Sequence, residues 1–150
     1  MKVGEIMSRE VVGVAVDDPV LKAAELMKIW DVGAVPVGDD GRFCGILTDR
    51  DIVLRCVASG RSPGEVEVGE IMTSRDLAMV SAEHSAIEAA RLMAKKKVRR
   101  LPVCRNGKLV GILTLGDIAK TRKMFSETAA AFCEVCAGRK KKPDREITEQ

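Results

Sequence analysis

The sequence predicts an α/β (α+β) fold in which two tandem β-α-β-β-α repeats, related by a pseudo-twofold axis, precede a C-terminal helical tail. Three observations lead to this fold class: an internal duplication, the same succession of helical and strand patterns in both copies, and a turn signal within each copy. With 150 residues, the chain can bury roughly two-thirds of its unfolded surface, so we expect one compact core.

The duplication is the strongest of these signals. The string VGEIM at 3–7 recurs unchanged at 68–72, and fourteen of the thirty positions between 23 and 52 are identical to those 66 residues later. A repeat of about 60 residues buries too little surface to be comfortably stable alone, so the two copies should pack on each other. We therefore divide the chain into repeat 1 (1–60), a linker (61–67), repeat 2 (68–124) and a tail (125–150).

Within each repeat, apolar spacing predicts a helix, then two strands and a second helix. The helical spacing is carried by Val20, Ala23, Ala24 and Met27 in repeat 1 and by Ile87, Ala90 and Met93 in repeat 2. The turns Asp39–Arg42 and Arg105–Lys108 separate the two strands, and Asn-Gly in particular favours the positive φ of a tight hairpin. The two strands of each copy should therefore pair antiparallel.

The string GILTxxD runs from a strand into a helix in both copies, at 45–51 and 111–117. One interpretation is a capping box, in which Thr48 and Asp51 satisfy free N–H groups of the first helical turn. The other is a binding site. The N–H groups and the hydroxyl accommodate an anion there, and the carboxylate accepts both hydroxyls of a ribose. A nucleotide supplies both groups, and the string alone leaves both interpretations open.

Taken together, these strings resemble the paired cystathionine beta-synthase (CBS) domain, or Bateman module, over roughly 3–124. The resemblance rests on VGEIM, the VPV and LPV strands, the Asp-Asp-Gly and Asn-Gly turns and both GILTxxD strings. It implies a regulatory module that holds AMP, ADP, ATP or S-adenosylmethionine in clefts between the copies, forms a homodimer and signals to a protein partner. We expect no enzyme, because the chain lacks a convincing nucleophile–base pair, metal-ligand set or cofactor signature.

The resemblance also implies which residues bind the ligand. Asp51 and Asp117 would hold ribose hydroxyls, and Thr48 and Thr114 would face phosphate or ribose. The VPV and LPV strands would help to form the pocket for the adenine base. The expected ligand-binding residues are Thr48, Asp49, Asp51, Thr114, Asp117, Val35, Pro36, Arg99, Arg100, Leu101 and Pro102.

The two copies also depart from the family and from each other. Many members carry a threonine where this chain has Gly13 and Met79, so a polar contact is missing in each copy. Arg99 and Arg100 stand where repeat 1 has Gly33 and Ala34, and arginine pairs well with phosphate. We therefore predict two unequal clefts, with the anionic end of the ligand toward the arginines. The alternative is a ligand-free structural protein that assembles through its repeats and tail.

Composition narrows the partners and the compartment. The net charge of +3, from 25 basic and 22 acidic residues, does not by itself indicate nucleic-acid binding. The lysines at 95–97 are interpreted as a solvated helix end. No apolar run is long enough to span a membrane, and Glu5 interrupts the start of the sequence, so we expect no membrane partner and a cytoplasmic location. Five cysteines, an odd number spread through apolar strings, suit reduced core thiols.

The tail predicts one more helix, with Ser126 as its N-cap and its end at Gly138. Cys133 and Cys136 would share one face of this helix. Packing or a dimer contact is the favoured interpretation, with zinc, an interchain disulfide or redox chemistry as alternatives. Two thiolates are half of a tetrahedral zinc site, so no cofactor is expected to be required. The run 139–142 is interpreted as a solvated tail.

Overall fold

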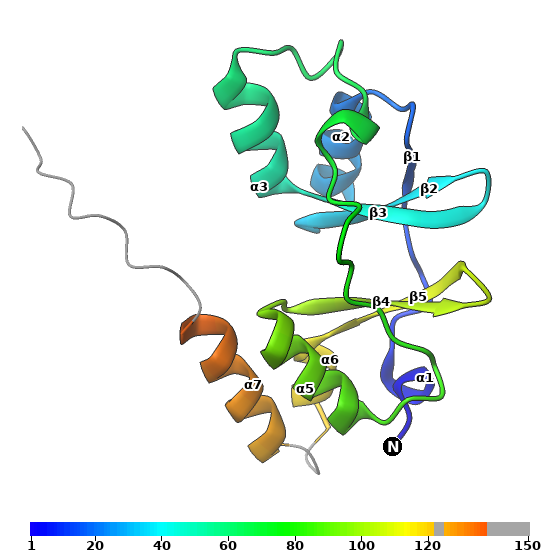
Figure 1. Ribbon diagram of the computed structural model, residues 1–150, viewed down its shortest axis with the longest axis vertical. Coiled ribbons are helices and arrows are strands. Elements are labelled where there is room, and N and C mark those ends of the chain that lie inside the picture. The colour runs from blue at the N-terminus through cyan, green and yellow to red at the C-terminus, as the bar shows by residue number, and fades with distance from the viewer. Residues whose placement is uncertain (122–124, 138–150) are drawn as a thin grey trace, which may run out of the picture.

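The computed structural model describes residues 1–121 and 125–137. It has two halves stacked on each other, each with a small sheet on the inner side and helices on the outer side, so that the two sheets face one another (Figure 1). The upper half in Figure 1 contains β1 (Val14–Ala15), α2 (Val20–Trp30), β2 (Ala34–Asp39), β3 (Arg42–Thr48) and α3 (Asp49–Asp51). The lower half contains α5 (Ala86–Lys96), β4 (Arg100–Arg105), β5 (Lys108–Thr114) and α6 (Leu115–Ala119).

The predicted hairpins are confirmed. β2 pairs antiparallel with β3, and β4 pairs antiparallel with β5, with the same register shift in both hairpins. Asp40 and Gly41 have φ of 46° and 76°, and Asn106 and Gly107 have φ of 53° and 76°, as the tight turns require. The hairpins touch where the Phe43 N–H donates to the Gly107 carbonyl at 3.2 Å.

The first strand of each repeat is short. β1 pairs parallel with β2, whereas repeat 2 has only a single parallel bridge between Val80 and Val103. This bridge consists of the Val80 N–H donating to Pro102 and the Cys104 N–H donating to Val80. The expected first strand of repeat 2 is therefore reduced to one residue.

The helix after β3 also differs from its counterpart. α3 continues into a π-helix, η1 (Ile52–Cys56), and a 3₁₀ turn, η2 (Val57–Ser59), whereas α6 is a short α-helix. Ile52 and Cys56 are buried, while Val53, Leu54 and Val57 are exposed. Repeat 1 therefore presents an apolar helical surface to solvent.

The two VGEIM strings exchange partners between the halves. They form α1 (Val3–Ile6) and α4 (Val68–Ile71). The Val3 N–H donates to His84, so α1 packs on the half formed by repeat 2. The Val68 N–H donates to Asp18, so α4 packs on the half formed by repeat 1. The repeats of the sequence are therefore not the spatial units of the fold.

The expectation of one compact core is wrong, because the structure has two. One contains Val20, Val35 and Leu47 together with Val68 and Ile71 from α4. The other contains Met93, Leu101, Leu113 and Ile118 together with Val3 from α1. Each sheet packs on its own helices, so the two apolar sets stay separate. Exchange of α1 and α4 joins the two halves instead.

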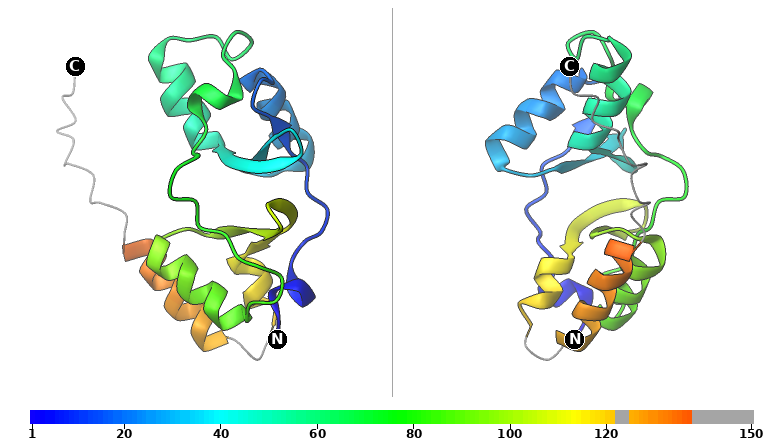
Figure 2. Two further views of the ribbon diagram at one scale, coloured as in Figure 1. Left: turned by 45° about the vertical axis from the view of Figure 1, so that its right-hand side comes forward. Right: turned by 90° about the vertical axis from the view of Figure 1, so that its left-hand side faces the viewer.

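The tail forms α7 (Phe125–Ala137), which lies along α5 and α6 (Figure 2). Ala131 is 3% exposed and belongs to the repeat 2 core, so it anchors this helix. The predicted end at Gly138 lies outside the described residues. Ser126 lies within α7, so it is not the N-cap. The run 139–142 lies outside the described residues.

None of the described helices is both long and apolar enough to cross a membrane. Cys56 is a buried free thiol, and Cys44 and Cys104 are half-buried free thiols. Burial raises the pKa of both half-buried thiols, and at Cys44 the Asp39 carboxylate acts in the same direction. Cys56 lies in the core of the upper half, and Cys44 packs against that core.

Candidate functional site

A cleft of about 520 Å³ lies where the two halves meet, between the start of α3 and the last turns of α7. We call it the central cleft. Its lining comes from the start of α3, the segment after α4, the connection between α5 and β4, and α7. The lining residues are Gly33, Ile46, Thr48, Asp49, Arg50, Thr73, Asp76, Leu77, Ala78, Lys96, Lys97, Val98, Arg99, Arg100 and Val135.

The central cleft is positively charged. Five cationic side chains line it, namely Arg50, Lys96, Lys97, Arg99 and Arg100, against two acidic ones, Asp49 and Asp76. Asp76 is already paired, because Lys96 Nζ lies 2.7 Å from its carboxylate and lowers the pKa of that carboxyl. The remaining cations exceed the remaining acid, so the cleft favours an anionic ligand.

The excess of positive charge is clearest at Arg100. It is half-buried, and within residues 1–121 and 125–137 neither it nor Arg99 forms an ion pair. Burial and the neighbouring Arg99 guanidinium lower the pKa of Arg100, while the Asp49 carboxylate acts in the opposite direction. A bound anion would therefore relieve an unfavourable concentration of positive charge.

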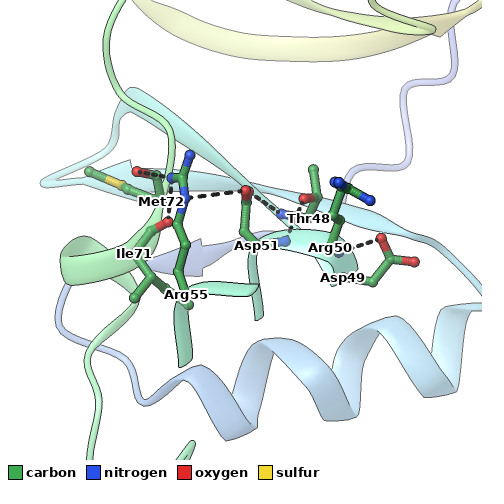
Figure 3. A network of polar contacts seen from close by, with 7 residues as sticks. All are labelled: Thr48, Asp49, Arg50, Asp51, Arg55, Ile71 and Met72. Atoms are coloured by element: carbon green, nitrogen blue, oxygen red, sulfur yellow. Dashed lines mark hydrogen bonds and ion pairs between the residues drawn. The ribbon is translucent and has the colours of Figure 1, made fainter. Parts of the chain in front are cut away.

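The GILTxxD string of repeat 1 forms the capping box (Figure 3). Thr48 Oγ1 accepts from the Asp51 N–H at 3.0 Å, and Asp51 Oδ2 accepts from the Thr48 N–H at 3.0 Å. Asp51 Oδ1 also lies 3.8 Å from Arg55 Nε, and Arg55 donates to the Ile71 carbonyl at 2.9 Å. Asp51 thus helps to connect α3 with α4, and its side chain is outside the cleft lining.

Repeat 2 repeats the arrangement. Asp117 Oδ2 accepts from the Thr114 N–H at 2.8 Å and from the Thr114 hydroxyl at 2.7 Å. Thr114 Oγ1 in turn accepts from the Asp117 N–H at 3.1 Å. The capping interpretation is therefore realised in both copies. The carboxylates remain partly accessible, with side-chain exposures of 15% for Asp51 and 20% for Asp117.

The predicted site residues do not share one cavity. Thr48 and Asp49 meet Arg99 and Arg100 in the central cleft. Val35, Pro36 and Pro102 line a gap of only about 10 Å³ between the two sheets, and Arg100 reaches it from the side. Leu101 is 0% exposed in the core and offers a ligand no side-chain surface. Thr114 lines a different cavity, next to α6 and α7.

Sequence reasoning missed several lining residues. Lys96 and Lys97, interpreted as a solvated helix end, face the cleft, and their position next to Arg99 was the available signal. Thr73, Leu77 and Ala78 had no signal, because they reach the cleft only through the placement of α4 on the other repeat. Arg50 belongs to the GILTxxD string itself.

The cysteine pair of the tail gives no metal site in the described residues. No group of three or more His, Cys, Asp or Glu side chains that could hold a metal occurs in 1–121 or 125–137. Cys133 is exposed on α7. The side chain of Cys136 lies outside the described set.

Comparison with known proteins identifies the architecture. The CBS domain matches residues 3–57 and 68–123, which together cover both repeats. The chain belongs to the CBS domain family. CBS-domain pairs are generally regulatory ligand-binding modules, and α7 lies beyond the matched residues.

Two relatives are small proteins of similar length. The CBS domain-containing protein YhcV of Bacillus subtilis is 41% identical over 129 residues, which cover 86% of this chain and 90% of YhcV. Hypoxic response protein 1 of Mycobacterium tuberculosis is 41% identical over 77% of this chain and 81% of its own length. The crystal structure of Hypoxic Response Protein I with two coordinated zinc ions superposes with a TM-score of 0.74 at 38% identity, over 81% of this chain and 98% of that chain.

Proposed function

We propose that this CBS pair is a cytosolic regulatory module that binds an adenine nucleotide in the central cleft and passes its occupancy to a partner protein, without catalysing a reaction itself. The observation that carries the proposal is the meeting of Arg99 and Arg100 of repeat 2 with Thr48 and Asp49 of repeat 1 in one cleft. Free thiols among the described cysteines support a reducing compartment.

The lining of the cleft matches the three parts of a nucleotide. Arg99 and Arg100 offer forked donors to phosphate. Asp49 lines the cleft and can accept a ribose hydroxyl there. The Asp51 carboxylate lies beside Thr48, just outside the lining, and is 15% exposed, so we propose that it turns toward the cleft to accept a second hydroxyl. Leu77 and Val98 contribute apolar surface for a base. A cleft of about 520 Å³ also has the usual size for a small-molecule site.

One cleft should bind more strongly than its pseudo-symmetric counterpart. The residues that align with Lys96, Lys97 and Arg99 are Trp30, Asp31 and Gly33, so the counterpart has no cations at these positions. Among the adenosine ligands, ATP and ADP should bind more tightly than AMP. S-adenosylmethionine should bind weakest, because its sulfonium is positively charged.

Asparagine variants test the assignment of the site. Asn at position 51 keeps an oxygen for the capping contact but removes the charge. We expect Asp51→Asn to weaken ATP binding about tenfold, the cost of one hydrogen bond to a charged group. The matched variant Asp117→Asn should leave it unchanged. Isothermal titration calorimetry measures both, and an unchanged affinity in both variants would refute the ribose assignment.

The proposed homodimer has a candidate surface on repeat 1. Its exposed apolar residues include Leu21, Ile29, Trp30, Val53, Leu54 and Val57. At the aligned positions repeat 2 has Ile87, Lys95, Lys96, Ala119, Lys120 and Lys123, and α7 covers part of its helices. Apolar side chains of this size usually mark an interface when they cluster on a surface, so we place the dimer contact on repeat 1.

Replacing two of these apolar residues with the lysines that repeat 2 carries at the aligned positions tests this contact. The double variant Trp30→Lys and Leu54→Lys should raise the dimer dissociation constant by at least about 30-fold, the effect of losing an interface hot spot. Both positions are about half exposed, at 53% and 50%, so the fold should tolerate the change. Sedimentation equilibrium measures the effect, with Met79→Lys, exposed on repeat 2, as the control. A wild-type chain that stays monomeric would contradict the placement.

A ligand-free assembly protein is the second candidate. The observation in its favour is that both Thr–Asp pairs are already hydrogen-bonded within their own capping boxes. A thermal-shift panel of AMP, ADP, ATP and S-adenosylmethionine separates the candidates, because a ligand that binds only the folded state raises the melting temperature. Zinc analysis of the purified chain tests whether Cys133 and Cys136 hold a metal as part of this assembly.

A further inference from the structure

A second cavity, also of about 520 Å³, lies between α6 and α7 and shares Arg99 and Arg100 with the central cleft. Leu115, Gly116 and Ala119 of repeat 2 form one wall, and Ala129 and Phe132 of α7 form the other. We call it the α6–α7 cavity. Because α7 lies outside the residues that match the CBS domain, this chain supplies one wall from its own additional helix.

The wall of this cavity that α6 provides is apolar because the first two residues of α6 differ from those of α3 in repeat 1. Leu115 and Gly116 align with Asp49 and Arg50 of repeat 1. Repeat 2 therefore has an apolar side chain and a glycine where repeat 1 has two charged side chains. On the opposite wall Phe132 is 55% exposed. An apolar molecule in the cavity would cover this aromatic surface and gain the free energy of its burial.

The rim of the cavity is positively charged. Arg99 and Arg100 border it as well as the central cleft. In the part of the chain that the structure describes, neither guanidinium forms an ion pair. Thr114 also reaches the rim, but its hydroxyl already donates to Asp117 at 2.7 Å. The site therefore joins an apolar interior to two arginines that attract an anion.

We propose that the α6–α7 cavity binds a small organic anion with a hydrocarbon body, of which a medium-chain fatty acid is the simplest example. The carboxylate lies at Arg99 and Arg100, and the hydrocarbon lies between Leu115 and Phe132. A nucleotide suits these walls poorly, because ribose and base would bury polar groups against the side chains of Leu115, Ala119, Ala129 and Phe132, which form no hydrogen bonds.

The shared arginines give this site a regulatory consequence. An anion held by Arg99 and Arg100 from the α6–α7 cavity withdraws them from the central cleft. Fatty acid and nucleotide should therefore weaken each other's binding by the same factor, since coupling between two sites is reciprocal. This step alone rests on the proposed nucleotide function.

Calorimetry with decanoate below its micelle concentration, in the absence of nucleotide, tests the site independently of the nucleotide proposal. We expect one site per chain. Each methylene that the walls cover should tighten binding about fourfold, so hexanoate should bind at least about tenfold more weakly. Decanol, which has the chain without the charge, should also lose about tenfold. Equal affinities for decanoate and decanol, or no binding of decanoate, would overturn the proposal.

A variant whose new side chain fills the α6–α7 cavity gives a second test of the site. An added Cβ at Gly116 would meet only Thr114 Oγ1, at 3.5 Å, and repeat 1 carries Arg50 at the aligned position, so Gly116→Leu should fold. It should weaken decanoate binding at least about tenfold by occupying the space. Ala130→Leu, which places a leucine side chain at an exposed position of α7, should not. Circular dichroism confirms folding of both variants, and an unchanged affinity in Gly116→Leu would refute the site. Binding only to phosphatidylglycerol vesicles, without binding of free decanoate, would likewise refute it.

Discussion

Replacing both Arg99 and Arg100 with alanine is expected to weaken ATP binding by about hundredfold or more. Each guanidinium can form charge-assisted hydrogen bonds with phosphate, worth about 1.5–3 kcal/mol, or roughly tenfold or more in affinity. The two residues are neighbours, so their effects need not add. Isothermal titration calorimetry of the single and double variants measures both the individual and the combined losses.

The same variants should keep the fold intact. Burial and the adjacent guanidinium disfavour the charged form of Arg100 in the free protein, so its removal relieves an unfavourable interaction. We expect an unchanged or higher melting temperature together with weaker ATP binding. Arg91→Ala, which removes an exposed arginine of α5 outside the cleft lining, is the matched control and should bind ATP normally. Wild-type affinity in the double variant would exclude the central cleft as the phosphate site.

The elements of the fold could be predicted from the sequence because their signals are local. Periodicity places α2 and α5, and the Asp-Gly and Asn-Gly turns place both hairpins. The exchange of α1 and α4 could not be predicted in this way. Both strings read VGEIM, so either copy offers the same side chains to either core. Only the three-dimensional path of the chain decides which half each string completes.

The site was predictable to the same extent. Arg99 and Arg100 were found because they break the repeat, and breaks in a duplicated pattern can be read directly from the sequence. Lys96 was missed because a helix end with several lysines is most simply explained by the helix dipole. Leu101 was included because its strand belongs to the motif, but alternation along that strand points the side chain into the core. A family motif thus identifies a strand more reliably than the direction of each side chain.

The glycine of GILT has a structural role that follows from the exchange. An added Cβ at Gly111 would lie 2.6 Å from Met7 Sδ and 2.7 Å from the Ser8 carbonyl oxygen. Gly45 meets Met72 and Thr73 in the same way, at 2.7 and 2.9 Å. Ser8 is held there by two backbone hydrogen bonds to Ile112, both 2.9 Å. The glycine therefore lets the residues that follow each VGEIM string lie directly on the strand of the opposite repeat.

Gly111→Ala should consequently destabilise the protein by about 1–3 kcal/mol, the cost of overpacking a fitted contact. The Met7 side chain can move, but the Ser8 backbone cannot retreat without losing its bonds to Ile112. Since each kcal/mol lowers the melting temperature of a chain this long by about 2–4 °C, a thermal melt resolves the change. The matched control is Gly116→Ala, where the new methyl meets only an ordinary contact at 3.5 Å and reduces the entropy of the unfolded chain. It should melt at or above the wild-type temperature, and equal melting of the two variants would show that α1 does not pack on β5.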